Sequence, residues 1–206
     1  MAFLDENYLL TNDTAKSIYQ QIEDLPIIDA HNHADVQAIY ENRPFSDIWE
    51  VEAATDHYVW EVLRKRGISE KYITGSASNF EKWRALAEVF DDVAGNPVYE
   101  WVHLDLKRQM NIDECICPDN AESIWERTAE KFQEEKFLPQ NLLQEMQVER
   151  MCSTDDPVDS LEYHKKLEDT PLAGVVRPTF RPDNAMNIFK PSWQEYIGRL
   201  EDRVGN

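Results

Sequence analysis

The alternation of predicted strands and helices constrains the fold of this chain more than any other feature. Short β-branched runs at residues 26–33, 149–154 and 174–182 predict three strands. Helical patterns at 161–167 and 192–200 follow the second and third of these runs. Strands that alternate with helices are typical of a parallel sheet covered by helices, so the predicted fold class is α/β.

A long helical stretch separates the first predicted strand from the second. Apolar residues recur there every three or four positions, and the individual runs end near Gly67, Gly95 and Pro139. We therefore predict a helical insertion at about residues 45–147, after the first strand. The sequence contains neither a repeat nor a Gly/Ser-rich linker, and we predict that residues 1–206 belong to a single domain.

Polar residues gather just after each predicted strand. His31 and His33 follow the first, Asp155 and Asp156 follow the second, and Arg181 follows the third. In a TIM-like (β/α)₈ barrel this edge of the sheet carries the chemistry. Closure of such a barrel needs eight strands, so the sequence predicts the N-terminal part of one, with about three strands. For Asp155 and Asp156 themselves, a helix-initiating turn is the favoured interpretation over a catalytic pair.

The charge of the chain excludes several classes of partner. Forty Asp and Glu against 21 Lys and Arg give a net charge of −19, which argues against binding to nucleic acid or to an anionic membrane. The sequence shows neither a membrane-spanning apolar run nor a signal peptide at its start, so we expect a cytoplasmic protein. The strong acidity fits either a solvated surface or a salt-rich cytoplasm. The three cysteines are expected to be ordinary thiols.

The motif His31-Asn32-His33 is the most specific chemical signal. Residues i and i+2 of a strand project from the same face about 7 Å apart, so both imidazoles can converge on one divalent metal, with zinc the natural choice. The alternative is a pair of unrelated histidines at a strand end. A catalytic zinc site needs three protein ligands. Since no other histidine stands at a predicted strand end, we expect the third ligand beyond residue 206.

The stretch Leu-Pro-Ile-Ile-Asp-Ala-His-Asn-His at residues 25–33 resembles the first strand of the amidohydrolase superfamily. Further segments resemble one family within it, the uronate isomerases, and they occur in that family's order over nearly the whole chain. These segments are residues 8–16, 55–60, 73–75, 95–99, 101–104, 153–157 and 180–183.

The resemblance implies a distorted (β/α)₈ barrel with a helical insertion after its first strand. It also implies one divalent metal, usually zinc, bound by His31, His33 and an aspartate of the last strand. The implied reaction is the aldose–ketose isomerisation of D-glucuronate to D-fructuronate and of D-galacturonate to D-tagaturonate. Complete chains of the family are considerably longer, and their metal-binding aspartate has no counterpart here.

The resemblance also assigns roles to residues outside the histidine motif. His57 and Tyr58 match the family's active-site His-Tyr pair, although residue types alone equally suggest a helix cap in this segment. Proton transfer through an enediol needs an acid/base near C1 and C2, so Tyr58 is the candidate for proton transfer and His57 for substrate orientation. Arg181 matches an arginine of the family and is the candidate for binding the uronate carboxylate. An ordinary ion pair with Asp183 is the alternative.

Three functional hypotheses follow from the sequence. The first is an intramolecular oxidoreductase, a uronate isomerase that acts on a small uronic acid. The second is a metal-dependent hydrolase of the same superfamily, in which the metal activates water. The third is an inactive truncated fragment. The sequence is compatible with a homo-oligomer but does not indicate one.

Overall fold

The computed structural model describes residues 3–205, and these residues form two compact units. Unit 1 contains the described residues up to Glu23 together with Pro44–Leu138. Unit 2 contains Asp24–Arg43 and the described residues from Pro139 onward. The predicted domain covers residues 1–206. Residues 1, 2 and 206 of it lie outside the described residues.

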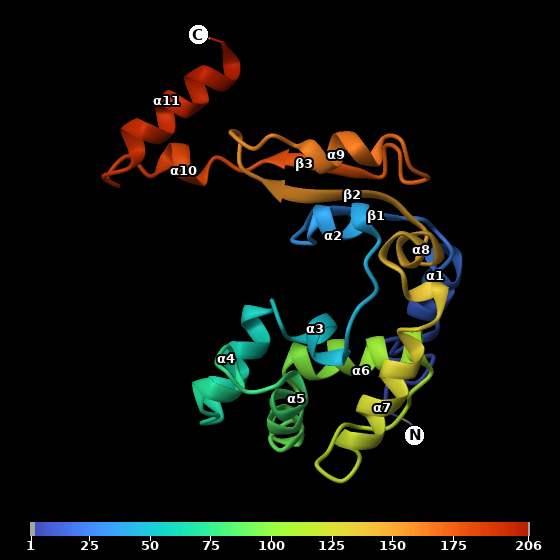
Figure 1. Ribbon diagram of the computed structural model, residues 1–206. Helices are drawn as coiled ribbons and strands as arrows, with labels where there is room; N and C mark the ends of the chain where they lie inside the picture. Colours follow the sequence, from blue (N-terminus) through green and yellow to red (C-terminus); the bar gives the residue numbers. More distant parts are fainter. Residues whose placement is uncertain (1–2, 206) are drawn as a thin grey trace. The chain divides into compact units, whose positions relative to one another are not determined.

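Unit 2 is built on a parallel three-stranded sheet in the order β1-β2-β3 (Figure 1). Its strands are β1 (Ile27–Asn32), β2 (Val148–Asp155) and β3 (Val176–Phe180). All three predicted strands are therefore confirmed to within a few residues. Helix α9 (Glu162–Leu167) connects β2 to β3 and gives the βαβ unit that parallel pairing requires.

The core of unit 2 lies between this sheet and its helices. Met151 and Ser153 alternate with less buried neighbours along β2, as the two-residue period of a strand dictates. A cluster of buried apolar side chains joins β2 and β3 to helices α2 (Val36–Glu41) and α9. The cluster consists of Ile39, Met151, Leu167, Leu172 and Val176.

The pairing of β1 with β2 is irregular, and β1 is more exposed than its sequence suggests. The β-branched run predicts a buried strand, but Ile27 is 43% and Ile28 67% exposed. This part of the prediction is wrong because, within the described residues, β1 pairs only with β2 and lies at the edge of the sheet. Asp29 pairs with Met151, whereas Asn32 pairs with Ser153, so β1 holds one residue more than β2 between these pairs.

Hydrogen bonds tie together the two points where the chain leaves unit 2 and returns to it. Helix α2 begins at the N-cap Asp35 and ends at Asn42, which adopts a left-handed conformation with φ 51°. Helix α8 (Pro139–Glu145) starts the return. The Gln140 backbone amide donates to Asn42 Oδ1 at 3.0 Å, and Gln140 Nε2 donates to the Ile39 carbonyl at 3.0 Å.

Unit 1 is helical (Figure 1). Its α-helices are α1 (Asp13–Ile22), α3 (Ile48–Glu52), α4 (His57–Lys65), α5 (Asn79–Ala87), α6 (Pro97–Met110) and α7 (Ala121–Lys131). Short 3₁₀ turns cover Glu70–Tyr72, Asp91–Val93 and Glu135–Phe137. The polar run Thr11-Asn12 before α1 predicts a cap from one of these two residues, and the structure assigns it to Asn12, whose Oδ1 accepts from the Ala15 amide at 2.9 Å.

Tryptophan and histidine side chains hold the core of unit 1 together. Trp83 is fully buried, and its Nε1 donates to the Ala121 carbonyl at 2.8 Å. The buried His103 Nε2 accepts from the Ile116 amide at 2.9 Å, while its Nδ1 lies 2.7 Å from the Tyr99 carbonyl. An accepting Nε2 carries no proton, so the ring is the neutral Nδ1–H tautomer. Burial lowers the pKa of this imidazole.

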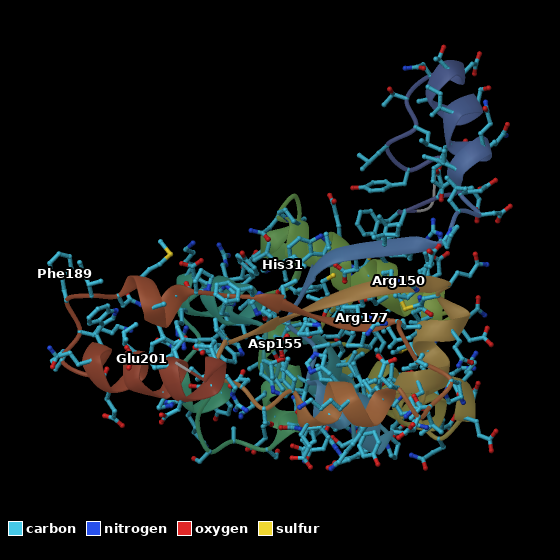
Figure 2. All side chains as sticks on the ribbon, turned by 90° about the horizontal axis from the view of Figure 1, so that it is seen from above. His31, Arg150, Asp155, Arg177, Phe189 and Glu201 are labelled. Atoms are coloured by element: carbon cyan, nitrogen blue, oxygen red, sulfur yellow. The ribbon has the colours of Figure 1, made fainter. Side chains whose placement is uncertain are left out.

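The turn after β2 anchors helices α10 (Asp183–Met186) and α11 (Trp193–Val204). The Asp156 carboxylate accepts from Tyr196 Oη at 2.8 Å and from Asn184 Nδ2 at 2.7 Å. Figure 2 shows the loop between α10 and α11, where Phe189 is 96% exposed. The predicted turn is present, but it does not start a helix directly, because α9 begins only at Glu162. The predicted helix at 192–200 is confirmed as α11.

None of the helices within residues 3–205 has the length and apolar character needed to cross a membrane. Cys115, Cys117 and Cys152 are free thiols.

Candidate active site

His31 and His33 lie together at the carboxyl end of β1, as the motif predicts (Figure 2 labels His31). Their Nε2 atoms are 3.0 Å apart, and the ring centroids are 4.9 Å apart at an interplanar angle of 72°. Both side chains are exposed. At this distance one ring donates its Nε2–H while the other accepts, so the two nitrogens face each other.

This pair fits a divalent metal in its donor type and its spacing. Two nitrogens 3.0 Å apart can both lie at the Zn–N distance of about 2.0–2.1 Å from one ion. Imidazole suits zinc and the other borderline divalent metals. Among residues 3–205, no group of three or more His, Cys, Asp or Glu is placed to hold an ion. The described part of the chain therefore offers two candidate donors at this point, His31 and His33.

A polar cavity of about 360 Å³ adjoins His33. Its walls come from the start of α2, the end of β2 and the start of α9. Ser153, Asp155 and His164 line it and form one network: Ser153 Oγ lies 2.8 Å from Asp155 Oδ2 and 2.7 Å from His164 Nε2. Figure 2 labels Asp155 near the end of β2. Sequence analysis missed this network, because His164 shows no pattern beyond that of a helix.

The hydrogen-bond directions in this network do not suit a serine nucleophile. Ser153 Oγ donates its single proton to the Asp155 carboxylate, so His164 Nε2 must itself carry a proton and donate to Oγ. A nucleophilic serine needs the reverse, with the hydroxyl donating to the imidazole. Ser153 is also only 2% exposed. The network is therefore structural at the end of β2.

Arg181 follows β3 and lies beside the end of β2. Its backbone amide donates to the Asp155 carbonyl at 3.0 Å and extends the β2–β3 ladder by one bond. The Arg181 side chain is exposed, and its Nε donates to Asp183 Oδ2 at 2.8 Å. The ion pair foreseen as an alternative thus exists. It is solvated, so its net stabilisation is at most about 1 kcal/mol, and a substrate carboxylate can compete for the guanidinium.

His57 and Tyr58 belong to unit 1 and open helix α4. Asp56 caps this helix, with its Oδ1 accepting from the Tyr58 amide at 2.7 Å. The two rings stack with centroids 4.2 Å apart, and Trp101 lies edge-on to Tyr58 at 6.2 Å. The segment is therefore a helix cap, as the residue types suggest, and it also presents Tyr58 with 54% of its surface exposed.

Glu52 is a buried carboxyl group of unit 1 that sequence analysis missed. It ends helix α3, is 8% exposed, and its Oε1 makes no hydrogen bond within the described residues. Burial, together with the negative charges of Asp105 and Asp56, raises the pKa of Glu52 well above its usual value of 4.5. The available sequence signal is its position four residues after the buried Ile48, on the same helix face.

Comparison with known proteins identifies the family. A sequence model described as "UxaC: Glucuronate isomerase" matches residues 1–206, the whole chain. The chain belongs to the glucuronate isomerase family. It is 54% identical over 203 residues to a uronate isomerase of Thermotoga petrophila and 53% identical over 203 residues to that of Thermotoga maritima. Each alignment covers 98% of this chain and 45% of the relative, so the chain spans about half the length of these relatives.

Solved structures of the glucuronate isomerase family share the fold. The crystal structure of the Thermotoga maritima uronate isomerase matches with a TM-score of 0.94 at 52% identity, covering all of this chain and 45% of that one. The Caulobacter crescentus glucuronate isomerase matches with a TM-score of 0.89 at 25% identity, covering 98% and 45%. The predicted fold, part of an amidohydrolase-type barrel with three parallel strands, is thereby confirmed.

Proposed function

We propose that this chain forms part of a uronate isomerase that interconverts D-glucuronate with D-fructuronate and D-galacturonate with D-tagaturonate. The observation that carries the proposal is the pair of converging Nε2 atoms of His31 and His33, at the strand end where such barrels carry their chemistry, in a member of this family. The family match and the segments that contain His57-Tyr58 and Arg181 favour the isomerase over the alternative, a hydrolase whose metal activates water.

We further propose that residues 1–206 are part of one barrel domain, with the helices at about 45–147 inserted after β1. The proposed substrate is a small uronic acid, and neither nucleic acid nor a membrane is a proposed partner. We propose a cytoplasmic enzyme, in keeping with its charge of −19. The described residues supply three strands, so we assign the activity to a complete eight-stranded barrel.

His31 and His33 are the proposed ligands of a divalent metal, with zinc the first choice, and a third protein ligand comes from outside residues 1–206. When bound, the metal polarises the carbonyl or hydroxyl oxygen of the sugar. Arg181 binds the substrate carboxylate, because its planar guanidinium can donate two parallel hydrogen bonds to that group. Its ion pair with Asp183 is exposed to solvent, so the substrate can replace Asp183 as the partner. A local cation is required to attract an anionic substrate to a protein of charge −19.

Tyr58 is the proposed proton-transfer group, and His57 orients the substrate. Isomerisation moves one proton from C2 to C1 through an enediol and a second from O2 to O1. The phenolate form of Tyr58 takes the C2 proton and, as the phenol, returns it to C1. The imidazole of His57, stacked on the phenol at 4.2 Å, can donate a hydrogen bond to a sugar hydroxyl. We propose proton rather than hydride transfer, because the sequence contains no nicotinamide fingerprint.

A chimera tests these assignments. Residues 1–206 replace the matching 203 residues of the Thermotoga maritima uronate isomerase, and the product is assayed for uronate-to-ketouronate conversion, for metal content and for exchange of the C2 hydrogen with solvent. We expect conversion with exchange. The proposal fails if the loaded, folded chimera hydrolyses amides or lactones but does not isomerise uronates.

Two variants of the chimera test individual residues. Tyr58→Phe should lower kcat by about 10²–10⁴-fold, and a loss within about threefold would remove its role in proton transfer. Arg181→Ala should raise KM for uronates far more than for a neutral aldose, whereas equal effects would exclude binding of the carboxylate.

A further inference from the structure

Asp29 has no role in the proposed reaction. Its carboxylate nevertheless accepts hydrogen bonds from the His31 backbone amide and from the side chain of Asn32, which lies between the two histidines. We propose that Asp29 is a positioning residue: it fixes the irregularly paired end of β1 and thereby holds His31 Nε2 close to His33 Nε2. The inference rests on the proposed metal site and extends it.

The pairing of β1 with β2 is irregular on both sides of Asp29. From Ile27 to Ile28, β1 advances one residue while β2 advances two, and from Asp29 to Asn32, β1 advances three while β2 advances two. His31 lies within the second of these irregular steps, and β1 ends at Asn32, directly before His33. Ladder hydrogen bonds alone therefore do not fix the backbone that carries the two imidazoles, whose Nε2 atoms are 3.0 Å apart.

Side-chain hydrogen bonds replace ladder bonds at this end of β1. Irregular pairing leaves backbone groups outside the ladder, and these groups need other partners. Asp29 Oδ1 accepts from the His31 amide at 3.1 Å, and Asp29 Oδ2 accepts from Asn32 Nδ2 at 2.6 Å. Asn32 Oδ1 in turn accepts from the Ala34 amide at 2.6 Å. A continuous series of hydrogen bonds thus connects the Asp29 side chain, through Asn32, to the backbone on either side of the two histidines.

The Asp29 carboxylate is placed to position the histidines and not to bind the ion itself. Both carboxylate oxygens of Asp29 are already engaged with the His31 amide and the Asn32 side chain. The side chain is half-buried, whereas both imidazoles are exposed. Asp29 is therefore directed into the strand end rather than to the point shared by the imidazoles, and its effect on a bound ion passes through His31 and His33.

The test is a titration of the 206-residue chain with Co²⁺, followed by its visible absorption. Loss of a residue that orients metal ligands typically weakens binding about 10–100-fold, so we expect this for Asp29→Ala. Asp29→Asn keeps one oxygen for the His31 amide but cannot accept from Asn32 Nδ2, so it should fall between wild type and Asp29→Ala.

Asp35→Ser is the matched control for charge. It removes one carboxylate two residues from His33 and keeps a side chain that can cap helix α2. We expect its Co²⁺ affinity to stay within about threefold of wild type. An equal loss for Asp35→Ser and Asp29→Ala would mean that charge alone acts, and it would overturn the positioning role.

Further variants separate this inference from the proposed site and from misfolding. If His31→Ala binds Co²⁺ as tightly as wild type, the metal site itself is wrong. If His31→Ala loses binding but Asp29→Ala does not, only the role of Asp29 is wrong. Should circular dichroism show that Asp29→Ala is unfolded, Asp29→Asn decides: wild-type affinity overturns the inference, and a severalfold loss supports it.

Discussion

The unpaired carboxyl of Glu52 makes unit 1 less stable as the pH rises. Its pKa is raised in the folded protein by burial and by the charges of Asp105 and Asp56. A folded state that keeps a proton which the unfolded state has lost is destabilised with increasing pH. The contribution of Glu52 is therefore fully favourable below about pH 4.5 and is lost progressively as the pH rises toward the folded-state pKa.

The size of this effect follows from proton linkage. A difference of one bound proton changes the free energy of unfolding by about 1.4 kcal/mol per pH unit. Glu52→Gln removes the titration and keeps the shape of the side chain. The stability of Glu52→Gln relative to wild type should therefore rise by about 1.4 kcal/mol per pH unit above pH 5, until the folded-state pKa is reached.

Urea denaturation at pH 5, 6 and 7 measures the difference. In a Trp193→Phe background every remaining tryptophan lies within unit 1, so fluorescence reports on this unit. Glu130→Gln, an exposed change on α7, is the control and should give the same small difference at each pH. If the advantage of Glu52→Gln over wild type is the same at pH 5 and pH 7, then Glu52 titrates normally and the reasoning is refuted.

Two further predictions concern other buried polar groups. Burial lowers the pKa of His103 in the folded chain. Below about pH 6.5 this imidazole is therefore protonated in the unfolded chain but stays neutral in the folded one. The stability of His103→Gln relative to wild type should therefore rise as the pH falls from 7 to 5, and a difference that stays constant in urea denaturation would contradict this. Ser153→Ala removes the hydroxyl between Asp155 and His164, and we expect a loss of about 1–3 kcal/mol. Ser192→Ala, whose hydroxyl makes no cap bond, should lose far less in thermal unfolding by circular dichroism, and equal losses would count against the network.

The parts of the fold that depend on local pattern can be predicted from the sequence. The strands β2 and β3 and the capped helix α1 follow from runs and caps within about ten residues. Helix α2 was missed, because at six residues it is too short to show a helical period. The exposure of Ile28 was missed as well, because burial depends on which elements flank a strand rather than on its own residues.

In the candidate site, too, the features that depend on neighbouring residues can be predicted from the sequence, and those that depend on distant elements cannot. The convergence of His31 and His33 follows from their spacing in a strand, and the structure bears it out. The irregular register of β1 does not follow, because register exists only relative to β2, more than one hundred residues later. Glu52 resembles any surface glutamate in the sequence, and only the packing of its neighbours makes it a buried acid.

The long separation of β1 from β2 has a consequence for how the chain folds. Bringing β1 and β2 together closes the long loop between them, which costs about 4 kcal/mol of chain entropy before any contact between the strands offsets this cost. The buried apolar core of unit 1 consists of residues from within that loop, so it can form without the sheet. Its formation shortens the free loop, and the bonds from Gln140 to Asn42 and Ile39 then act as a latch at the base of that loop. Strand pairing is therefore the slow, late step, and a change at Gln140 should show itself in refolding kinetics before it shows in the finished structure.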